Sequence, residues 1–418
     1  MVNVDKLQRP VPGLRPHVVD FADGLDMTQV VMLAVVNNPG LKAVRARRRT
    51  ARAQLFTAGL LPDPQLNLGF DHPSGGPPPL TNAFGLGLRA NLQALITRGA
   101  AQAAQAEAAR QVDLEVLWQE WQVAQRSRVL VARSLAEKKL LHVARIAQNF
   151  LADRYAQSSA ALHAGDVTLD VAAADLVGLT DADTRLRDIE REINRTQHDV
   201  AVLLGLAPDA RLVLVKARPS QPFSSRQFDN ALHELARRRP DLVALQAGYR
   251  SQNYHLREAI LAQFPSLNVG FNRARDTSDV SSVGFGITIG LPLFNRNRGE
   301  IAIQRNTRAQ LRAEYQVRLN NAVMNAHLVW TNARLLSRQL RAARARLPAL
   351  AAMTAMARRG FDSGALDPLI FITLQTNLLA KRSEVVRLEQ SLREAQIGLE
   401  TLLGITLEPR WIALNKPS

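Results

Sequence analysis

The stretch Pro64-Gln65-Leu66-Asn67-Leu68-Gly69-Phe70 recurs, with conservative changes, as Pro265-Ser266-Leu267-Asn268-Val269-Gly270-Phe271, 201 positions further along the chain. At the same offset, residues 39–92 align with residues 240–293 without a gap. Later the offset becomes 199, with Gly165 over Gly364. A drift of only two positions indicates one duplicated unit of about 200 residues, so each half of the chain should be one structural module.

Both copies of the stretch alternate between apolar and polar or small residues. Leu66, Leu68 and Phe70 fall on one face, and the residues between them fall on the other. This period of two is typical of a β-strand. The alternation resumes after a loop rich in Pro and Gly, so we predict one β-hairpin in each half, over residues 64–92 and 265–293.

Long helices are expected around the hairpins. Residues 26–61 are predicted to form a helix, and nothing interrupts the helical pattern over 99–164, which would extend about 95 Å. The second half ends in a heptad pattern, which indicates long helices that supercoil around their neighbours. That heptad consists of Leu374, Leu378, Lys381, Val385, Leu388, Leu392, Ala395, Leu399 and Leu402.

These patterns divide the chain into five parts. We expect an N-terminal extension over 1–24, a first repeat over 25–205 and a linker over 206–227. A second repeat over 228–404 and a tail over 405–418 follow. Each repeat would hold a helix, a β-hairpin and a helical hairpin, the latter over 99–205 and 299–404. The predicted fold class is therefore mainly α, with a contribution to a membrane β-barrel.

Composition excludes several kinds of function. The chain has no cysteine, which excludes disulfides and thiolate metal sites. The 53 basic and 37 acidic residues give a net charge of +16, but the arginines lack the aromatic interleaving of a nucleic-acid surface, so no nucleic-acid partner is expected. The eight histidines have no ligand spacing, and we expect no metal site and no cofactor. No catalytic motif is present, and we expect no enzymatic activity.

No stretch of 18 apolar residues indicates a membrane helix, and Met1 to Pro16 lack the apolar core of a secretion signal.

The four predicted strands need partners. An apolar face opposite a face of Gly, Asn, Ser and Thr is typical of a membrane barrel, although a soluble sheet packed on a core would alternate in the same way. Four strands cannot close a barrel, and lipid does not tolerate an open sheet edge. Three copies would supply twelve strands and two copies only eight, so we prefer a homotrimer that completes one barrel.

The order of elements resembles that of the TolC-like outer membrane factors of tripartite efflux systems, over about residues 25–405. The resemblance is carried by residues 61–66, 264–267 and 289–299 and by the hairpin tips at Gly165 and Gly364. In the third stretch, Pro292, Asn295 and Gly299 mark the turn from strand to helix. Residues 291–301 are most similar to the CzcC-like branch, which is associated with divalent-metal efflux.

The resemblance implies a passive exit duct. Such a protein is a trimer with a twelve-stranded barrel in the outer membrane of a Gram-negative bacterium and an α-helical tunnel in the periplasm. A periplasmic adaptor and an inner-membrane pump, most often of the RND type, would deliver drugs or divalent metal cations. The alternative is a soluble periplasmic coiled-coil scaffold or adaptor, which would explain the heptads but not the Gly-rich strands.

The resemblance also directs attention to the tips. Many members place acidic residues six and nine positions after the tip glycine, but here Ile370 and Thr373 follow Gly364 at those positions. Carboxylates lie nearby in Asp166, Asp170 and Asp367, and we name all five residues as candidates for the tunnel gate. The alternative is that these carboxylates only satisfy free N–H groups at helix starts.

Charge is distributed unevenly between two limbs. Eight arginines and no acid lie between Glu314 and Asp362, whereas nine acids and four arginines lie from Asp166 to Asp199. We predict that the outgoing limb of the second half packs beside the return limb of the first, pairing opposite charges as flanking positions of coiled coils do. The alternative is two solvated faces that contribute little.

Overall fold

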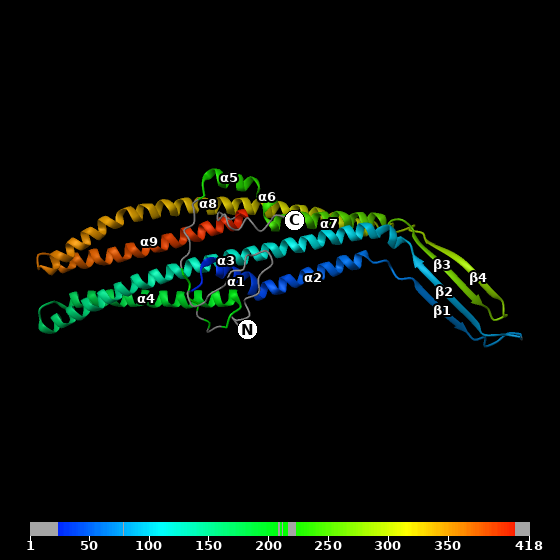
Figure 1. Ribbon diagram of the computed structural model, residues 1–418, viewed down its shortest axis with the longest axis horizontal. Coiled ribbons are helices and arrows are strands. Elements are labelled where there is room, and N and C mark those ends of the chain that lie inside the picture. Colours follow the sequence, from blue (N-terminus) through cyan, green and yellow to red (C-terminus); the bar gives the residue numbers. More distant parts are fainter. Residues whose placement is uncertain (1–23, 78, 208–209, 211, 216–222, 406–418) are drawn as a thin grey trace. The chain divides into compact units, whose positions relative to one another are not determined.

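The computed structural model describes residues 24–77, 79–207, 210, 212–215 and 223–405 (Figure 1). The first half contains α1 (Met27–Asn37), α2 (Pro39–Gly59), β1 (Gln65–Asp71), β2 (Ala83–Asn91), α3 (Gln93–Ala164) and α4 (Leu169–Leu204). The second half contains α5 (Ser225–His233), α6 (Leu235–Arg238), α7 (Pro240–Leu261), β3 (Ser266–Arg275), β4 (Ser281–Gly290), α8 (Arg298–Asp362) and α9 (Pro368–Leu403). Each half thus runs from a hairpin into a pair of long helices, and the prediction of a mainly helical fold with a small sheet is confirmed.

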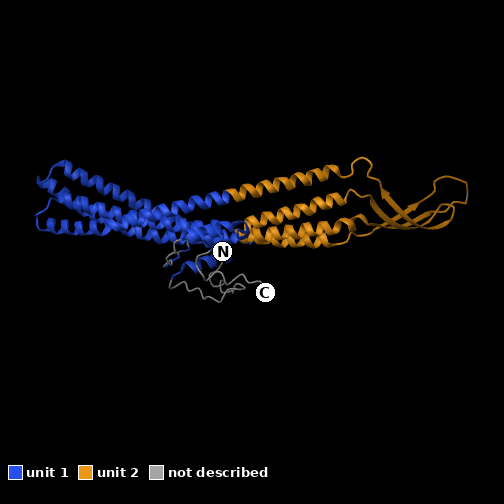
Figure 2. Cartoon of the chain, turned by 90° about the horizontal axis from the view of Figure 1, so that it is seen from above, with its two compact units in different colours: residues 1–43, 119–239, 321–418 blue, residues 44–118, 240–320 orange. Residues whose placement is uncertain are grey.

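The chain forms two compact units (Figure 2). Unit 1 comprises residues within 1–43, 119–239 and 321–418, and unit 2 comprises residues 44–118 and 240–320. Both halves of the sequence contribute to both units, because the long helices α3 and α8 each supply residues to both. The expected extension before residue 24 and the expected tail after residue 405 lie outside the described residues.

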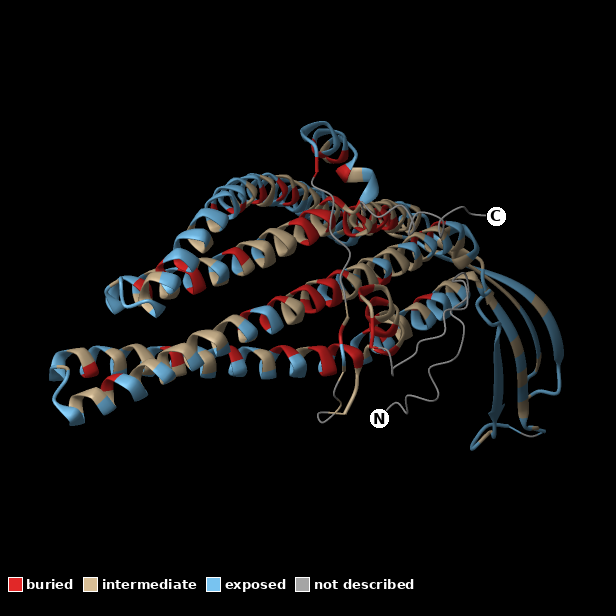
Figure 3. Cartoon of the chain, turned by 60° about the vertical axis from the view of Figure 1, so that its left-hand side comes forward, coloured by how far each residue is buried: buried red, intermediate tan, exposed pale blue. Residues whose placement is uncertain are grey.

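In unit 2 the four strands form one antiparallel sheet in the order β1-β2-β3-β4. The register places Leu68 opposite Leu86 and Phe271 opposite both Leu88 and Phe285, so the apolar residues of both repeats share one face. The other face carries pairs such as Asn67 with Gly87. The side chains on the apolar face are largely uncovered, as the pale strands of Figure 3 show. Phe70 is 66% exposed and Phe285 is 70% exposed.

In unit 1 the long helices follow the order α8, α9, α3, α4, with each joined to the next by polar contacts. Arg344 of α8 reaches Glu389 of α9, and Lys139 of α3 reaches the same carboxylate. Thr196 of α4 bonds to Glu137 of α3. The heptad of α9 packs as expected, because Val385, Leu388 and Leu392 lie against Leu340 and Ala343 of α8.

A separate hydrophobic core of unit 1 lies where α1 packs against α3 and α4. Its buried members are Leu25, Met27, Val30, Leu33, Ala34, Leu130, Val131, Val200, Leu203, Leu204 and Leu214. Leu214 belongs to the predicted linker and forms a parallel bridge with Leu25. The last residues of that predicted linker already belong to α5, which Ser224 starts with a capping box.

The predicted single helix over 26–61 is wrong, since the chain breaks into α1 and α2 at Asn38. This residue precedes Pro39 and adopts φ −50° and ψ 120°, because proline disfavours the helical conformation in the residue before it. The Asn38 side chain then accepts a hydrogen bond from the Leu41 N–H and donates one to the Leu203 carbonyl. The break therefore caps α2 and ties it to the end of α4.

None of the helices within the described ranges combines the length and the apolar character that a membrane crossing requires.

Candidate functional site

Both helical hairpins turn through the same backbone motif. Gly165 and Gly364 have φ values of 82° and 73°, in the left-handed region that glycine adopts without strain. At the first tip the Gly165 N–H donates to Leu162 and the Asp166 N–H to Ala161. The second tip repeats these two bonds at Gly364 and Ala365. This pair of bonds closes the last turn of the outgoing helix and sets where the return helix starts.

The candidate carboxylates lie around these turns and are all exposed. Asp367 is the N-cap of α9, and its side chain accepts a bond from the Leu369 N–H at 2.8 Å. Asp170 lies in the first turn of α4, where a hydrogen bond with the Thr168 side chain lowers the pKa of its carboxyl. Helix-start roles thus account for two of the three carboxylates. Both carboxylates remain exposed and accessible to cations.

Ile370 and Thr373 also project from the second tip, where both are exposed. No hydrogen bond or ion pair within the described ranges joins Asp170 of the first tip to Asp367 of the second. One chain therefore carries two separate tips and does not by itself bring the candidate gate residues together.

An aromatic cluster that the sequence did not reveal anchors the second tip. Phe371 is buried, stacks on Phe361 with ring centroids 5.3 Å apart and meets Phe150 of α3 edge-on at 5.8 Å. The Arg358 guanidinium lies over the Phe371 ring at 5.6 Å and also pairs with Asp362. Phe361 lies three residues before Gly364 and Phe371 lies seven residues after it, and no sequence pattern indicated that the two rings would meet.

In unit 2 the connection from β4 to α8 spans residues 291–297, so it includes Pro292 and Asn295 but not Gly299. Asn295 contributes its carbonyl, which accepts from the Arg298 N–H, and Pro292 lies just beyond the strand. Gly299 already belongs to α8, and a Cβ added there would meet no atom within 4 Å. Asn297, which the prediction missed, has a φ of 53° and donates from its side chain to the Ala259 carbonyl of α7. Asn tolerates the left-handed conformation better than most residues, so Asn297 fixes this turn.

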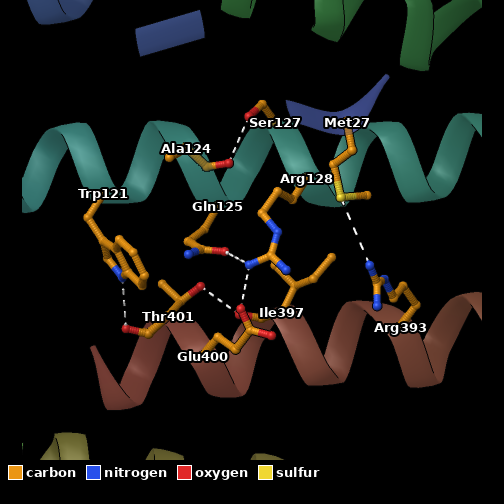
Figure 4. A network of polar contacts seen from close by, with 10 residues as sticks. All are labelled: Met27, Trp121, Ala124, Gln125, Ser127, Arg128, Arg393, Ile397, Glu400 and Thr401. Carbon is orange, nitrogen blue, oxygen red and sulfur yellow. Dashed lines mark hydrogen bonds and ion pairs between the residues drawn. The ribbon is translucent and has the colours of Figure 1, made fainter. Parts of the chain in front are cut away.

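A buried polar network joins α3 to α9 (Figure 4). The Arg128 guanidinium pairs with the Glu400 carboxylate, and the side chains are 7% and 0% exposed. Gln125 accepts a further bond from Arg128 at 2.8 Å, and the Trp121 indole donates to the Thr401 carbonyl at 3.3 Å. Buried charges need such partners, so this network fixes how the two repeats meet within unit 1.

A second, more exposed group of charges lies on the same seam. Glu389 of α9 accepts from Arg344 at 2.6 Å and from Lys139 at 3.4 Å. Burial alone would raise the pKa of Glu389, but the Arg344 hydrogen bond and the charge of Lys139 outweigh it, and the pKa lies below its ordinary value. Three helices, α8, α9 and α3, therefore share one carboxylate.

The predicted pairing of α8 with α4 is wrong for a single chain. Among the described residues, the α4 carboxylates that form ion pairs are Asp175, which pairs with Arg154 of α3, and Asp188, which pairs within α4. Helices α9 and α3 lie between α8 and α4 (Figure 1). The charges in the sequence indicate that α8 and α4 attract each other. They do not indicate that α9 and α3 lie between these two helices in one chain.

Within the described ranges, no group of three or more His, Asp or Glu side chains is arranged to hold a metal ion.

Comparison with known proteins gives a family-model match for part of the chain and structural matches for nearly all of it. Residues 231–405 match the family model described as outer membrane efflux protein. No curated protein sequence matches the chain. Several solved structures have the same fold despite low identity. CusC, described in terms of transmembrane channel formation, is 18% identical with a TM-score of 0.76, covering 96% of this chain and 99% of its own.

Two further channels extend this finding. The CmeC outer membrane channel of Campylobacter jejuni is 16% identical with a TM-score of 0.76, over 91% of this chain and 86% of its own. The outer membrane protein VceC of Vibrio cholerae is 15% identical with a TM-score of 0.72, over 91% and 97%. The family-model match over residues 231–405 and the structural matches together support a TolC-like outer membrane factor. The matched family is one of outer membrane efflux channels and is not an enzyme family.

Proposed function

We propose that three copies of this chain associate into one passive duct, with the strands in the outer membrane of a Gram-negative bacterium and the long helices in the periplasm. The single observation that carries this proposal is the sheet of unit 2. No described residue covers its apolar face, and its outer strands β1 and β4 each have one edge without a strand partner in the described part of the chain. Lipid tolerates a sheet only when its edges are closed. Three sheets of four strands supply that closure.

In this duct the apolar face of each sheet contacts lipid and the face of Gly, Asn and Thr lines the lumen. Neighbouring residues of β4 then have opposite environments. Ile287 is 57% exposed on the apolar face, and Thr288 lies opposite Asn268 on the other. A charge on the lipid side costs about 2–4 kcal/mol near the middle of the bilayer, whereas the lumen accepts it.

A matched pair of variants tests this assignment. Ile287→Arg should abolish heat-modifiable insertion into outer-membrane lipid, and Thr288→Arg should insert normally and change only ion selectivity. Full-length protein in planar bilayers should give discrete conductance steps, and its mass in detergent should equal three chains. A monomer without conductance, or equal insertion of both variants, would refute the duct.

The duct needs energy and a docking partner from elsewhere. We propose that an inner-membrane pump, of the RND type, and a periplasmic adaptor supply them. The fold shared with CusC and CmeC supports this assignment. Whether the cargo is a drug or a divalent metal cation then depends on the pump. Susceptibility of a deletion strain to a panel of metals and drugs would identify it.

We further propose that the tips form the narrowest part of the duct, where Asp166, Asp170 and Asp367 attract cations and Ile370 and Thr373 narrow the path. Asp170→Asn and Asp367→Asn remove charge, and an Asn at 367 retains the capping oxygen. The double variant should lose cation preference in a planar bilayer. Asp362→Asn is the control, because that carboxylate already pairs with Arg358. Unchanged selectivity in the double variant would exclude the gate.

A further inference from the structure

The shared carboxylate Glu389 is a contact between the two repeats of one chain. Arg344 comes from α8, the coil partner of α9, and Lys139 comes from α3 of the other repeat. Glu389 therefore forms one ion pair with Arg344 inside the helix pair α8–α9, and a second ion pair with Lys139 that joins this helix pair to α3. It lies on the surface of unit 1, where both cationic side chains are more than half exposed.

The duplication supplies a counterpart for each of these three residues. At the offset of 199 that aligns Gly165 with Gly364, Glu389 corresponds to Glu190, Arg344 to Arg145 and Lys139 to Arg338. All three positions keep the sign of their charge. Since two repeats with the same fold make equivalent contacts, a second three-way contact should exist.

That second contact cannot form within one chain. Glu190 lies on α4 and Arg338 on α8, and α3 and α9 separate these helices (Figure 1). Glu190 and Arg338 are both exposed. We propose that Arg338 of one copy pairs with Glu190 of the next copy, so that α8 of each chain packs against α4 of its neighbour. This inference rests on the proposed trimer and defines its seam.

The surfaces around the pair fit a helix-to-helix seam. On α8, exposed apolar or small side chains recur every seven residues, which places them on one face. They are Leu328, Leu335, Ala342, Ala349 and Met356. On α4, exposed Leu169, Ala173, Leu176 and Thr180 alternate in steps of four and three from the tip. No described residue of the same chain covers either face, and the two faces are complementary to each other.

The charges of the two helices also match. The eight arginines between Glu314 and Asp362 lie on α8, and eight of the nine acids from Asp166 to Asp199 lie on α4. Opposite charges at flanking positions of a coiled coil favour one partner and one register. The occupant of the α8 face is therefore a second copy of this chain.

Cross-linking between introduced cysteines tests the seam directly, because the chain has no cysteine of its own. Two long side chains that form an ion pair leave their Cβ atoms too far apart for a disulfide, so a short bis-maleimide is the suitable reagent. Full-length protein carrying Arg338→Cys and Glu190→Cys should give cross-linked dimers and trimers on denaturing gels and no larger species. Each single variant should stay monomeric on the gel.

Glu192 provides the matched control, since it lies two residues along α4 and lines a groove with Arg387 of its own chain. Arg338→Cys with Glu192→Cys should give at least tenfold less cross-linked trimer. Charge reversal adds a second readout. Arg338→Glu or Glu190→Arg alone should weaken trimer formation by about fivefold per seam, and the two together should restore it.

The outcomes separate this inference from the proposed duct. A trimer by mass that conducts ions but gives no 338–190 cross-link would overturn the seam and leave the duct intact. Cross-linked trimers that give no conductance would support the seam and overturn the duct. Cross-linked species larger than a trimer on the gel would also overturn the seam, as would equal cross-linking of the control pair at positions 338 and 192.

Discussion

The Thr196 hydroxyl of α4 donates a 2.7 Å hydrogen bond to Glu137 Oε1 of α3, joining two buried side chains 59 positions apart. The other carboxylate oxygen, Oε2, has no hydrogen-bond partner in the described part of the chain. Burial raises the pKa of Glu137, and the Thr196 bond and the charge of Arg133 only partly oppose this rise. Ionisation of this carboxylate near neutral pH therefore lowers the stability of the folded state.

The Glu137→Gln variant should be more stable than the parent protein near pH 7. The folded state binds its proton more tightly than the unfolded state, so stability falls as pH rises above the ordinary value of 4.5. Gln retains the oxygen that accepts from Thr196 and carries no charge. Thermal midpoints in detergent should differ at pH 7 and converge below about pH 4.5. A difference that is independent of pH would contradict this account.

The buried ion pair of Arg128 and Glu400 makes a second prediction. Glu400→Ala leaves a buried guanidinium without its carboxylate and should cost about 3–5 kcal/mol. Replacing both residues by Leu should recover most of that loss, since apolar side chains tolerate burial. The control is Glu394→Ala, whose pair with Arg133 is 37% and 27% exposed and should cost about 1 kcal/mol or less. Thermal unfolding in detergent would measure the stability of all three variants. Equal losses of stability in Glu400→Ala and Glu394→Ala would contradict the prediction.

The local elements of this fold were readable from sequence because their periods are strong. Leu66, Leu68 and Phe70 alternate over enough residues to indicate a strand, and the heptad through Val385 and Leu388 matches the observed packing. The break at Asn38 was missed because Leu33 and Leu41 continue a helical spacing across it. The conformational restriction imposed by Pro39 outweighs that spacing.

Contacts between the repeats were harder to predict. The Phe361, Phe371 and Phe150 cluster depends on which helix lies next to α9, and no local pattern contains that information. Asn297 was overlooked for a similar reason, since its role depends on the Ala259 carbonyl of another helix. The charge asymmetry of α4 and α8 was visible, but one chain keeps those helices apart. Sequence periodicity therefore predicted the secondary-structure elements and the hairpin tips. Which helices lie next to one another could be seen only in the structure.

The tip glycine Gly364 should be intolerant of a side chain. Its φ of 73° is left-handed, and an added Cβ costs about 1–2 kcal/mol in that conformation. Gly364→Ala should therefore lower the thermal midpoint or loosen the turn, as hydrogen exchange at Ala365 would report. Gly299→Ala is the control, because Gly299 is helical and nothing lies near the new Cβ. It should be neutral or stabilise by up to about 1 kcal/mol, and a loss there equal to that at Gly364 would contradict the argument.

The aromatic cluster should hold the second tip in one conformation. Phe371 is buried between Phe361 and Phe150, and Arg358 covers its ring, so Phe371→Ala removes packing across three helices. Burial of this size is worth about 3–5 kcal/mol. Since the cluster lies beside the Gly364 turn, part of the loss should appear as a mobile tip, with faster protease cleavage near Ala365 and longer open times in a planar bilayer. Leu369→Ala, 67% exposed two residues away, should change stability by less than about 0.5 kcal/mol and leave cleavage unchanged. If Phe371→Ala lowers stability but leaves cleavage and open times as in the parent, the cluster only stabilises the helix bundle and does not hold the tip.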